Sequence, residues 1–398
     1  MSGQRRAKKE TGSSLPRSLS DFESSSSFAC KELSLKRDLS IEIGKNPDMP
    51  FVETKKPLEK LAFYRHQVAG HYPIFWKKGE VCKPIQKNEL EFYKHIQAKI
   101  PELVPFVPKY LGVLDMEYEQ LPPTPQKFEF SQSQANTTEF NHFNSWGLRC
   151  HQKKKQALKR RSVIKYIRLE DLTLPFSRPN ILDLKIGTRV YGVNDDPEKV
   201  RRKMRKSALT TSKSLGLRLC GMQVYNSIDD GYKFRDKFFG RDLDNGGFEK
   251  CIKEFFSSQD GKLRISVMEN LIQRIEELLK VVAEQKSFQF FSSSLLFICE
   301  GCLTSDQKRL HGNVKNDNYQ RIDLRFIDFA QAARDTERKG VDDGFLLGLR
   351  NIVKIMRGLI NFSRKGVGAD SEPQQISKSS LGNLCEERNE IKEKDSQL

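Results

Sequence analysis

Apolar residues follow two different spacings along the chain, and these spacings predict where helices and strands lie. Residues 265–285 and 345–360 place apolar side chains every three or four positions, which predicts two amphipathic helices. Shorter helices are predicted at residues 88–96 and 200–207. Short apolar runs predict strands at residues 181–186, 288–298 and 324–329. Because these elements intermingle without a regular βαβ repeat, the pattern favours an α+β fold.

Charged and aliphatic residues alternate in the predicted strand within residues 179–187 (PNILDLKIG). Successive side chains of a strand point to opposite faces, so Asp183 and Lys185 would share one face, opposite Leu182, Leu184 and Ile186. At about 3.3 Å per residue, the acid and the amine would stand about 6.6 Å apart, with room for a reacting hydroxyl and a phosphoryl group. A carboxylate can orient or deprotonate a hydroxyl, and a lysine can neutralise phosphoryl oxygens. The simpler alternative is an exposed strand face with a surface ion pair.

A strongly basic helix is predicted after Asp196, a suitable N-cap residue, with Pro197 in the first helical position. One face of this helix carries four cations at i, i+3, i+4 and i+7: Lys199, Arg202, Lys203 and Lys206. Such crowding is unfavourable unless an anion lies against it, which suits a ligand with many phosphates. A solvated basic face or a nucleic-acid patch are the alternatives.

Two further positions suit nucleotide chemistry. Asp328 lies between Ile327 and Phe329, where a carboxylate is costly to desolvate unless it binds a cation such as Mg²⁺. A hydrogen-bonded turn would explain the same residue. Lys83, followed by Glu89 on a predicted helix, is similar to the lysine and glutamate that brace nucleotide phosphates in protein kinases. The chain contains neither GxxxxGK[ST] nor GxGxxG.

Composition restricts the partners and the cellular setting. The chain has 398 residues, with 69 Lys and Arg against 52 Asp and Glu, and the resulting net charge of +17 favours an anionic partner. Residues 1–45 and 363–398 are polar, with few apolar positions, and are predicted to be disordered tails. No apolar run is long enough to span a membrane, and no secretory signal is evident. We therefore expect reduced cysteines and a cytoplasmic or nuclear location.

The order of these elements resembles the inositol polyphosphate kinase family. Residues 179–187 match its PxxxDxKxG pattern, residues 293–296 its SSLL element, and residues 327–329 its IDF element. Several segments are most similar to the inositol hexakisphosphate kinases within that family: residues 66–71, 146–151, 221–225, 235–241 and 290–296. Three elements in the expected order make the resemblance specific.

The resemblance covers about residues 51–356 and implies a bilobal, kinase-like fold with ATP in a cleft between the lobes. The first lobe would span residues 46–172, with a polar surface loop at about 118–144. The second lobe would span residues 173–362 and hold the catalytic and inositol-phosphate-binding elements.

The resemblance also implies roles for residues around the nucleotide. Lys83 would contact the ATP phosphates, with Glu89 steadying it. Glu170 and Leu172 would lie at the hinge between the lobes and meet adenine through backbone groups. Asp328 would hold Mg²⁺, and Ser294 would lie near the metal.

On the acceptor side, Asp183 would handle the attacking group and Lys185 the γ-phosphate of ATP. The inositol phosphate pocket would be lined by Lys199, Arg202, Lys203 and Lys206. Animal members of the family usually have histidine two residues after the IDF element, where this chain has Gln331. Glutamine cannot carry a proton or a positive charge, so substrate contact or regiochemistry would differ there.

These inferences predict a kinase that transfers the γ-phosphoryl group of ATP to inositol hexakisphosphate. One alternative is an inositol polyphosphate multikinase, which phosphorylates ring hydroxyls of less phosphorylated inositols. Another is a non-catalytic basic module that binds nucleic acid or acidic lipid. Pure binding has no need for Asp183 and Asp328, so these acids argue against the last alternative.

Overall fold

The structure is a computed structural model. It describes residues 61–70, 72–117, 121–122, 152–153, 163–193, 195–228, 230–301, 321–334 and 342–365, all of which belong to a unit that spans Pro57–Leu398. The predicted tail at 1–45, nearly all of the predicted loop at 118–144 and residues 366–398 of the predicted C-terminal tail lie outside the described residues.

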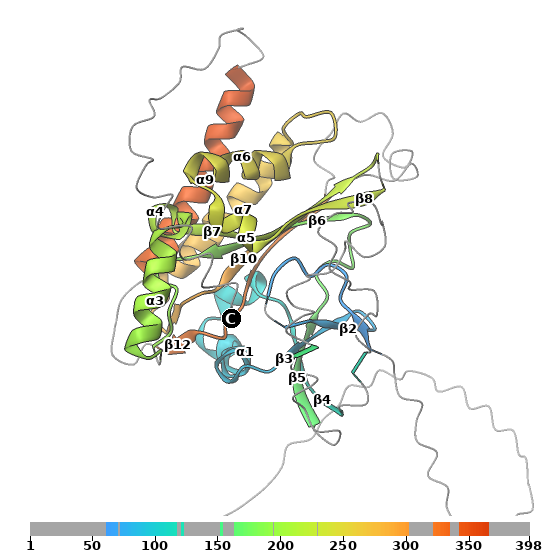
Figure 1. The fold of residues 1–398 in the computed structure, drawn as a ribbon, viewed down its shortest axis with the longest axis vertical. Coiled ribbons are helices and arrows are strands. Elements are labelled where there is room, and N and C mark those ends of the chain that lie inside the picture. The colour runs from blue at the N-terminus through green and yellow to red at the C-terminus, as the bar shows by residue number, and fades with distance from the viewer. Residues whose placement is uncertain are drawn as a thin grey trace, which may run out of the picture. The chain divides into compact units, whose positions relative to one another are not determined.

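An antiparallel sheet of five strands forms the N-terminal part of the described fold (Figure 1). Its order is β1-β2-β3-β5-β4, with bounds Ala62–Phe63, Phe75–Lys77, Glu80–Pro84, Val163–Glu170 and Tyr110–Glu117. Helix α1 (Lys87–Lys99) and a 3-10 helix (Pro101–Phe106) connect β3 to β4. Helix α1 buries Phe92, Tyr93 and Ile96, which confirms the helix predicted at residues 88–96.

A second antiparallel sheet of five strands carries the charged segment predicted from the sequence. Its order is β11-β10-β6-β7-β8, with bounds Ile322–Ile327, Ser294–Glu300, Pro179–Ile186, Leu217–Asn226 and Gly231–Arg235. Strand β6 lies at the centre, and Leu182, Leu184 and Ile186 on it are completely buried in the main core. The predicted alternation along this strand is therefore confirmed.

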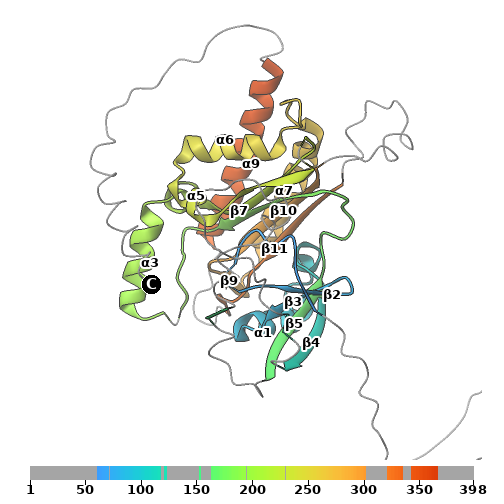
Figure 2. The same cartoon turned by 45° about the vertical axis from the view of Figure 1, so that its right-hand side comes forward.

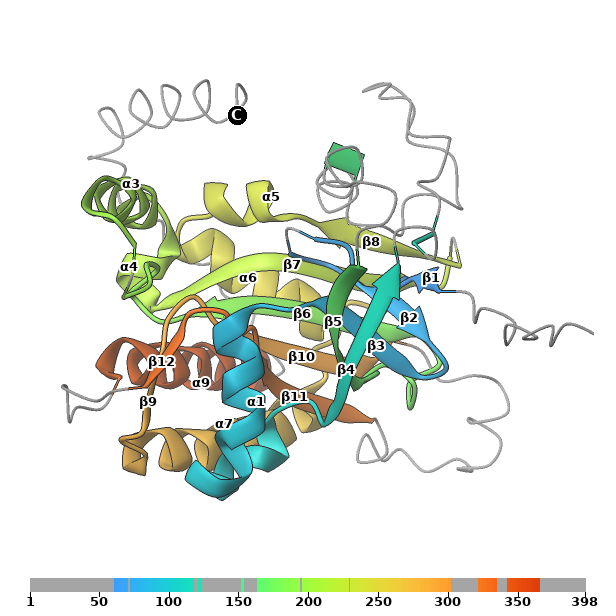
Figure 3. The same cartoon turned by 90° about the horizontal axis from the view of Figure 1, so that it is seen from below.

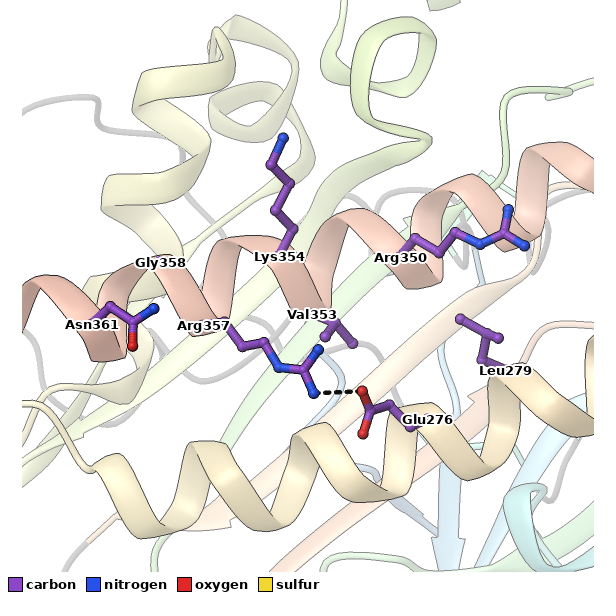
Figure 4. Close-up of a pocket in the computed structure, with 8 residues that line it drawn as sticks. All are labelled: Glu276, Leu279, Arg350, Val353, Lys354, Arg357, Gly358 and Asn361. Carbon is purple, nitrogen blue, oxygen red and sulfur yellow. Dashed lines mark hydrogen bonds and ion pairs between the residues drawn. The ribbon is translucent and has the colours of Figure 1, made fainter.

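Helices cover the face of the second sheet that lies away from α1 and the first sheet (Figures 1 and 3). They are α5 (Lys237–Asp242), α6 (Asn245–Phe256), α7 (Ile265–Glu284) and α9 (Asp343–Lys365). Helices α7 and α9 are the two predicted amphipathic helices, and they lie side by side with an ion pair of 2.7 Å between Glu276 and Arg357 (Figure 4). None of the described helices is long and apolar enough to cross a membrane.

The basic helix α3 (Pro197–Ala208) begins as its sequence predicts (Figure 2). The short helix α4 (Thr211–Leu215) lies beside it (Figures 1 and 3). The Asp196 side chain accepts a hydrogen bond from the backbone N–H of Lys199, and Pro197 occupies the first helical position. An N-cap carboxylate satisfies a backbone donor that has no partner within the helix. The start of this helix is therefore set by its own sequence.

Two predicted strands differ from the observed ones because a residue with positive φ interrupts each run. The run predicted at 288–298 is two strands: β9 (Phe288–Phe290), which pairs with β12 (Ala332–Arg334), and β10. Ser292 between them has a φ of 58°, and extended backbone cannot continue through that conformation. The run predicted at 324–329 ends at Ile327 because Asp328 has a φ of 67°. Helix α9 also continues to Lys365, five residues beyond the predicted helix. The predicted disordered tail at 363–398 is therefore wrong for residues 363–365, which form the last turn of this helix.

The segment before β2 lies directly against β7. A Cβ atom built on Gly221 would stand 2.2 Å from the backbone oxygen of Val68, which no real side chain allows. Gly221 is also the cross-strand partner of Asp183. The absence of a side chain at this position therefore lets the segment cover the sheet beside the charged strand.

We expect Gly221→Ala to lower the free energy of unfolding by about 1–3 kcal/mol, the usual cost of overpacking. Urea denaturation measures this change. The matched control is Gly358→Ala in α9, where a Cβ atom meets nothing within 4 Å (Figure 4). The free energy of unfolding of that variant should rise by up to about 1 kcal/mol, because alanine has a better helix propensity than glycine. Equal stability of the two variants would contradict the close contact at Gly221.

Candidate active site

A cleft of about 570 Å³ lies between the two sheets. Its walls come from residues 64–74, from β3, β6 and the start of β7, from α3 and α5, and from the turn after β11. The cleft brings together six of the residues predicted for the site: Lys83, Asp183, Lys185, Lys203, Lys206 and Asp328. Six others lie outside its walls: Glu89, Glu170, Leu172, Lys199, Arg202 and Ser294.

Lys83 holds two carboxylates from different parts of the chain. Its Nζ atom lies 2.9 Å from Glu89 Oε1 and 2.5 Å from Asp328 Oδ1. Burial alone would lower the pKa of Lys83, but the carboxylates of Asp328 and Glu89 outweigh burial and raise it above the ordinary value. Lys83 is therefore a fixed cation at the edge of the cleft. The predicted pairing with Glu89 is present, and the contact with Asp328 was not predicted.

The surroundings of Asp183 disfavour the ionised form of its carboxyl group. Burial, followed by repulsion from Asp328, raises the pKa of Asp183 to about 7, although a hydrogen bond from Ser294 opposes the shift. Its Oδ1 atom is buried and has no hydrogen-bond partner in the described part of the chain. A buried oxygen without a partner is costly, so this atom is suited to bind a ligand or a cation.

Lys185 lies two residues further along the same face of β6. Its Nζ atom donates a hydrogen bond of 3.0 Å to the backbone oxygen of Ser292, the residue that separates β9 from β10. Burial lowers the pKa of Lys185 below its ordinary value. The ammonium group is therefore positioned by a single backbone acceptor and can donate a further hydrogen bond to an anionic oxygen.

The turn after β11 places Asp328 in a strained conformation. A positive φ at a residue other than glycine costs of order 1–3 kcal/mol and persists only where the surroundings enforce it. The next residue, Phe329, is fully buried and stacks on Phe92 of α1, with ring centroids 3.9 Å apart. This packing anchors the turn, so that the Asp328 carboxylate faces the cleft.

The carboxylates fit a hard cation that is bound together with phosphates. Within the described ranges, no cluster of three or more His, Cys, Asp or Glu side chains could hold a metal ion alone. Mg²⁺ typically takes only one or two protein carboxylates and completes its shell with water and substrate phosphates. Asp328 and the unpartnered oxygen of Asp183 match that requirement, whereas Ser294 is fully buried behind them and hydrogen-bonds to Asp183.

The predicted hinge residues make structural contacts where β5 ends. Glu170 Oε1 accepts hydrogen bonds from the backbone of Lys109 at 2.9 Å and from Arg325 Nη1 at 3.2 Å. Leu172 packs against Ile181 and Ile298 in a small apolar cluster. Their side chains thus join the two sheets, and neither lines the cleft.

Asp195, for which the sequence analysis predicts no role, pairs with two lysines of α3. One carboxylate oxygen lies 2.6 Å from Lys199 Nζ and the other 2.7 Å from Lys203 Nζ. These hydrogen bonds outweigh desolvation and hold the pKa of Asp195 well below its usual range. The chain itself therefore supplies part of the negative charge that the basic face of α3 requires. The i, i+4 spacing of Asp195 and Lys199 is the sequence feature that could have indicated this pair.

The sequence also does not reveal that the segment before β2 covers the cleft. The buried Gln67 amide donates to the backbone oxygens of Ala69 and Tyr72 and accepts from the N–H of Ile74. These three bonds fix the course of residues 64–74 above the cleft. From the sequence alone, the segment at 66–71 shows only a similarity to the family.

A cleft between two antiparallel sheets, lined by two carboxylates and several fixed cations, defines the class of phosphoryl-transfer enzymes with a two-lobed fold. The chain matches the inositol polyphosphate kinase family over residues 166–357. Mouse inositol hexakisphosphate kinase 3 is 29% identical over 76% of this chain and 95% of its own length. Human inositol hexakisphosphate kinase 2 is 32% identical over 61% of this chain and 64% of its own length.

A solved structure shares the fold. The crystal structure of an inositol phosphate multikinase from S. cerevisiae, in complex with ADP and Mn²⁺, aligns with a TM-score of 0.50 and 26% identity. The alignment covers 71% of this chain and 99% of that one. These matches confirm the resemblance to the inositol polyphosphate kinase family and the α+β, two-lobed fold expected from the sequence.

Replacing Asp183 with asparagine should stabilise the protein at neutral and alkaline pH. An aspartate in an unfolded chain ionises near pH 4, whereas folded Asp183 ionises near pH 7. The wild type therefore loses stability relative to Asp183→Asn as pH rises from about 4 to about 7, and the difference persists above pH 7. At pH 8 we expect Asp183→Asn to gain at least about 1 kcal/mol in free energy of unfolding.

Chemical denaturation at pH 4, 6 and 8 measures the difference. The matched control is Asp115→Asn, because Asp115 is 54% exposed and pairs only with exposed Lys165. This control should change stability by no more than about 0.5 kcal/mol. A constant difference between wild type and Asp183→Asn at all three pH values would show that Asp183 is not held against ionisation.

Proposed function

We propose that this protein transfers the γ-phosphoryl group of ATP to a phosphate of inositol hexakisphosphate, forming a diphosphoinositol polyphosphate. The observation that carries the proposal is the convergence of Lys83, Asp183, Lys185 and Asp328 on one cleft that lysines of α3 also line. Relatives named inositol hexakisphosphate kinases, 29–32% identical to the chain, support the choice of acceptor.

Different residues of the cleft assist different parts of an in-line phosphoryl transfer. An acceptor phosphate oxygen forms a bond to the γ-phosphorus while the bond to the β–γ bridging oxygen breaks, and ADP leaves with that electron pair. The acceptor is already ionised near neutral pH, so Asp183 serves to orient it. Lys185 neutralises the γ-phosphate oxygens, and Lys83, steadied by Glu89, binds the nucleotide phosphates on the other side.

We propose Mg²⁺ as the divalent cation that accompanies ATP, held by Asp328 and approached by the free oxygen of Asp183. Such an ion neutralises charge on the transferring phosphates when it is bound. The strained turn and the ion pair with Lys83 hold the Asp328 carboxylate at the cleft before any ligand enters. The yeast multikinase structure contains ADP and Mn²⁺, which supports a divalent ion that accompanies the nucleotide.

The basic wall suits an acceptor that carries many phosphates. Lys203 and Lys206 line the cleft from α3, while Lys199 lies behind them in its pair with Asp195. Fixed cations offset the repulsion between ATP and a second highly charged anion. Gln331 also lines the cleft and offers a neutral hydrogen-bonding group where many relatives have histidine.

A second candidate is an inositol polyphosphate multikinase activity on ring hydroxyls. The observation in its favour is the pKa of Asp183 at about 7, because a general base that removes a hydroxyl proton works best near the ambient pH. An acceptor phosphate has no such proton to lose.

An assay of the purified protein with ATP, Mg²⁺ and a panel of inositol phosphates distinguishes the two activities. We expect a diphosphorylated product from inositol hexakisphosphate, detected by its later elution in anion-exchange chromatography. Product from inositol trisphosphate, with none from the hexakisphosphate, would replace our proposal with the multikinase activity.

Lys185→Ala and Asp328→Asn should each lower kcat at least about 100-fold, because each removes a group that acts on the transferring phosphate or its cation. Both variants should melt cooperatively, as followed by circular dichroism. Lys354→Ala, on the outer face of α9, is the matched control and should keep wild-type turnover (Figure 4). Near-normal activity of either cleft variant would refute its assigned role.

A further inference from the structure

Arg218 and Lys185 place two positive charges directly opposite each other. They are cross-strand partners in the antiparallel pair of β7 and β6, and both line the cleft. Leu217 and Leu219, the neighbours of Arg218, are completely buried, so Arg218 points to the cleft face of the sheet. Like charges directly opposite each other destabilise a sheet unless an anion lies between them.

No carboxylate in the described part of the chain pairs with Arg218, in contrast to the cations nearby. Lys83 is matched by Glu89 and Asp328, and Lys203 by Asp195. The free protein therefore holds a repulsive pair of cations that an anionic ligand would relieve.

The order of the sheet assigns Arg218 to the acceptor side of the reaction. Asp328 follows β11, which is separated from β6 by β10, whereas Arg218 is on β7, the neighbour of β6 on the other side. Adjacent strands lie about 4.8 Å apart, so Lys185 stands between a nucleotide side and an acceptor side. Helices α3 and α4 immediately precede β7 in the chain, and Lys203 and Lys206 line the cleft together with Arg218 (Figure 3).

A second arginine reaches the same part of the cleft from α5. This helix approaches β7 so closely that a Cβ atom on Gly240 would stand 2.1 Å from the backbone oxygen of Leu219. Only glycine allows that approach, and the next residue, Arg241, lines the cleft. Arg218 and Arg241 thus form a wall that is separate from the lysines of α3; we refer to it as the arginine wall.

We propose that the arginine wall binds phosphates of the inositol polyphosphate acceptor, with Arg218 holding the phosphate that lies beside Lys185. This inference rests on the proposed function and extends it to two residues with no assigned role. A guanidinium can hold one phosphate through two parallel hydrogen bonds, so Arg218 fixes the orientation of the acceptor as well as its charge. The wall therefore favours acceptors with more phosphates.

The test compares Arg218→Gln with Arg218→Lys and with the wild type. Hydrogen bonds to charged groups contribute about 1.5–3 kcal/mol, so we expect Arg218→Gln to weaken acceptor binding roughly 10-fold to 100-fold. Isothermal titration calorimetry with inositol hexakisphosphate and no nucleotide measures the Kd, and steady-state assays measure KM for the acceptor and for ATP. The KM for ATP should not change. Arg218→Lys should retain an intermediate affinity, because a point charge replaces the two-pronged contact.

The matched control is Arg350→Gln, which removes an exposed arginine on α9 outside the cleft (Figure 4). It should leave both affinities unchanged. Thermal melting without ligand provides a second readout: loss of repulsion from Lys185 should leave Arg218→Gln at least as stable as the wild type. A lower melting temperature would instead assign Arg218 a structural role.

Three results for Arg218→Gln would overturn the inference. They are a wild-type affinity for the hexakisphosphate, a raised KM for ATP with an unchanged KM for the acceptor, and a lower stability of the free protein. The proposed function fails in a different way, through the absence of product from the hexakisphosphate with the wild type. In that case, calorimetry with the inositol phosphate that is turned over still tests the arginine wall.

Discussion

The ion pairs of Lys83 join the two halves of the fold and create the cleft between them. Lys83 is on β3, Glu89 on α1, and Asp328 in the turn after β11, so a single ammonium group connects both sheets. Glu89 is 1% exposed, and removal of its partner would leave a buried charge without compensation. Phe329, next to Asp328, stacks on Phe92 of α1, so apolar packing and charge hold the same junction. The position of Asp328 relative to β6 depends on this junction.

Strand β6 shows how a well-packed core can support an unfavourable set of charges. On one face its aliphatic side chains are completely buried, and on the other Asp183 and Lys185 are held where burial opposes their ionised forms. Arg218 adds a like charge beside Lys185. Each of these features lowers the stability of the free protein, and each is relieved by a ligand that brings phosphates and a cation. The strain is concentrated at the site where binding can relieve it.

Local patterns predicted the elements, and the contacts between distant segments could not be predicted. Alternation identified β6, the helical period identified α7 and α9, and Asp196 marked the start of α3. By contrast, Lys83 and Asp328 are 245 residues apart, and only the fold brings them together. The sequence did not reveal Arg218 because its position opposite Lys185 depends on the register between β6 and β7. That register cannot be read from either strand alone. The break at Ser292 depends on a single dihedral angle, which the surrounding residue types do not reveal.

The pairing of charges in the free protein separates the cations of the cleft into two groups. Asp195 neutralises part of α3 and keeps Lys199 and Lys203 in place, so that face can exist without a ligand. Arg218 has no carboxylate partner in the described part of the chain, and an anion bound beside Lys185 would reduce the repulsion between these two cations. A polyphosphate that binds beside Lys185 and Arg218 would relieve the repulsion between them, whereas on α3 it would compete with Asp195 for the lysines. The binding free energy gained is therefore larger at the β6–β7 pair than at the helix. In the proposed reaction, this difference would place the acceptor beside Lys185.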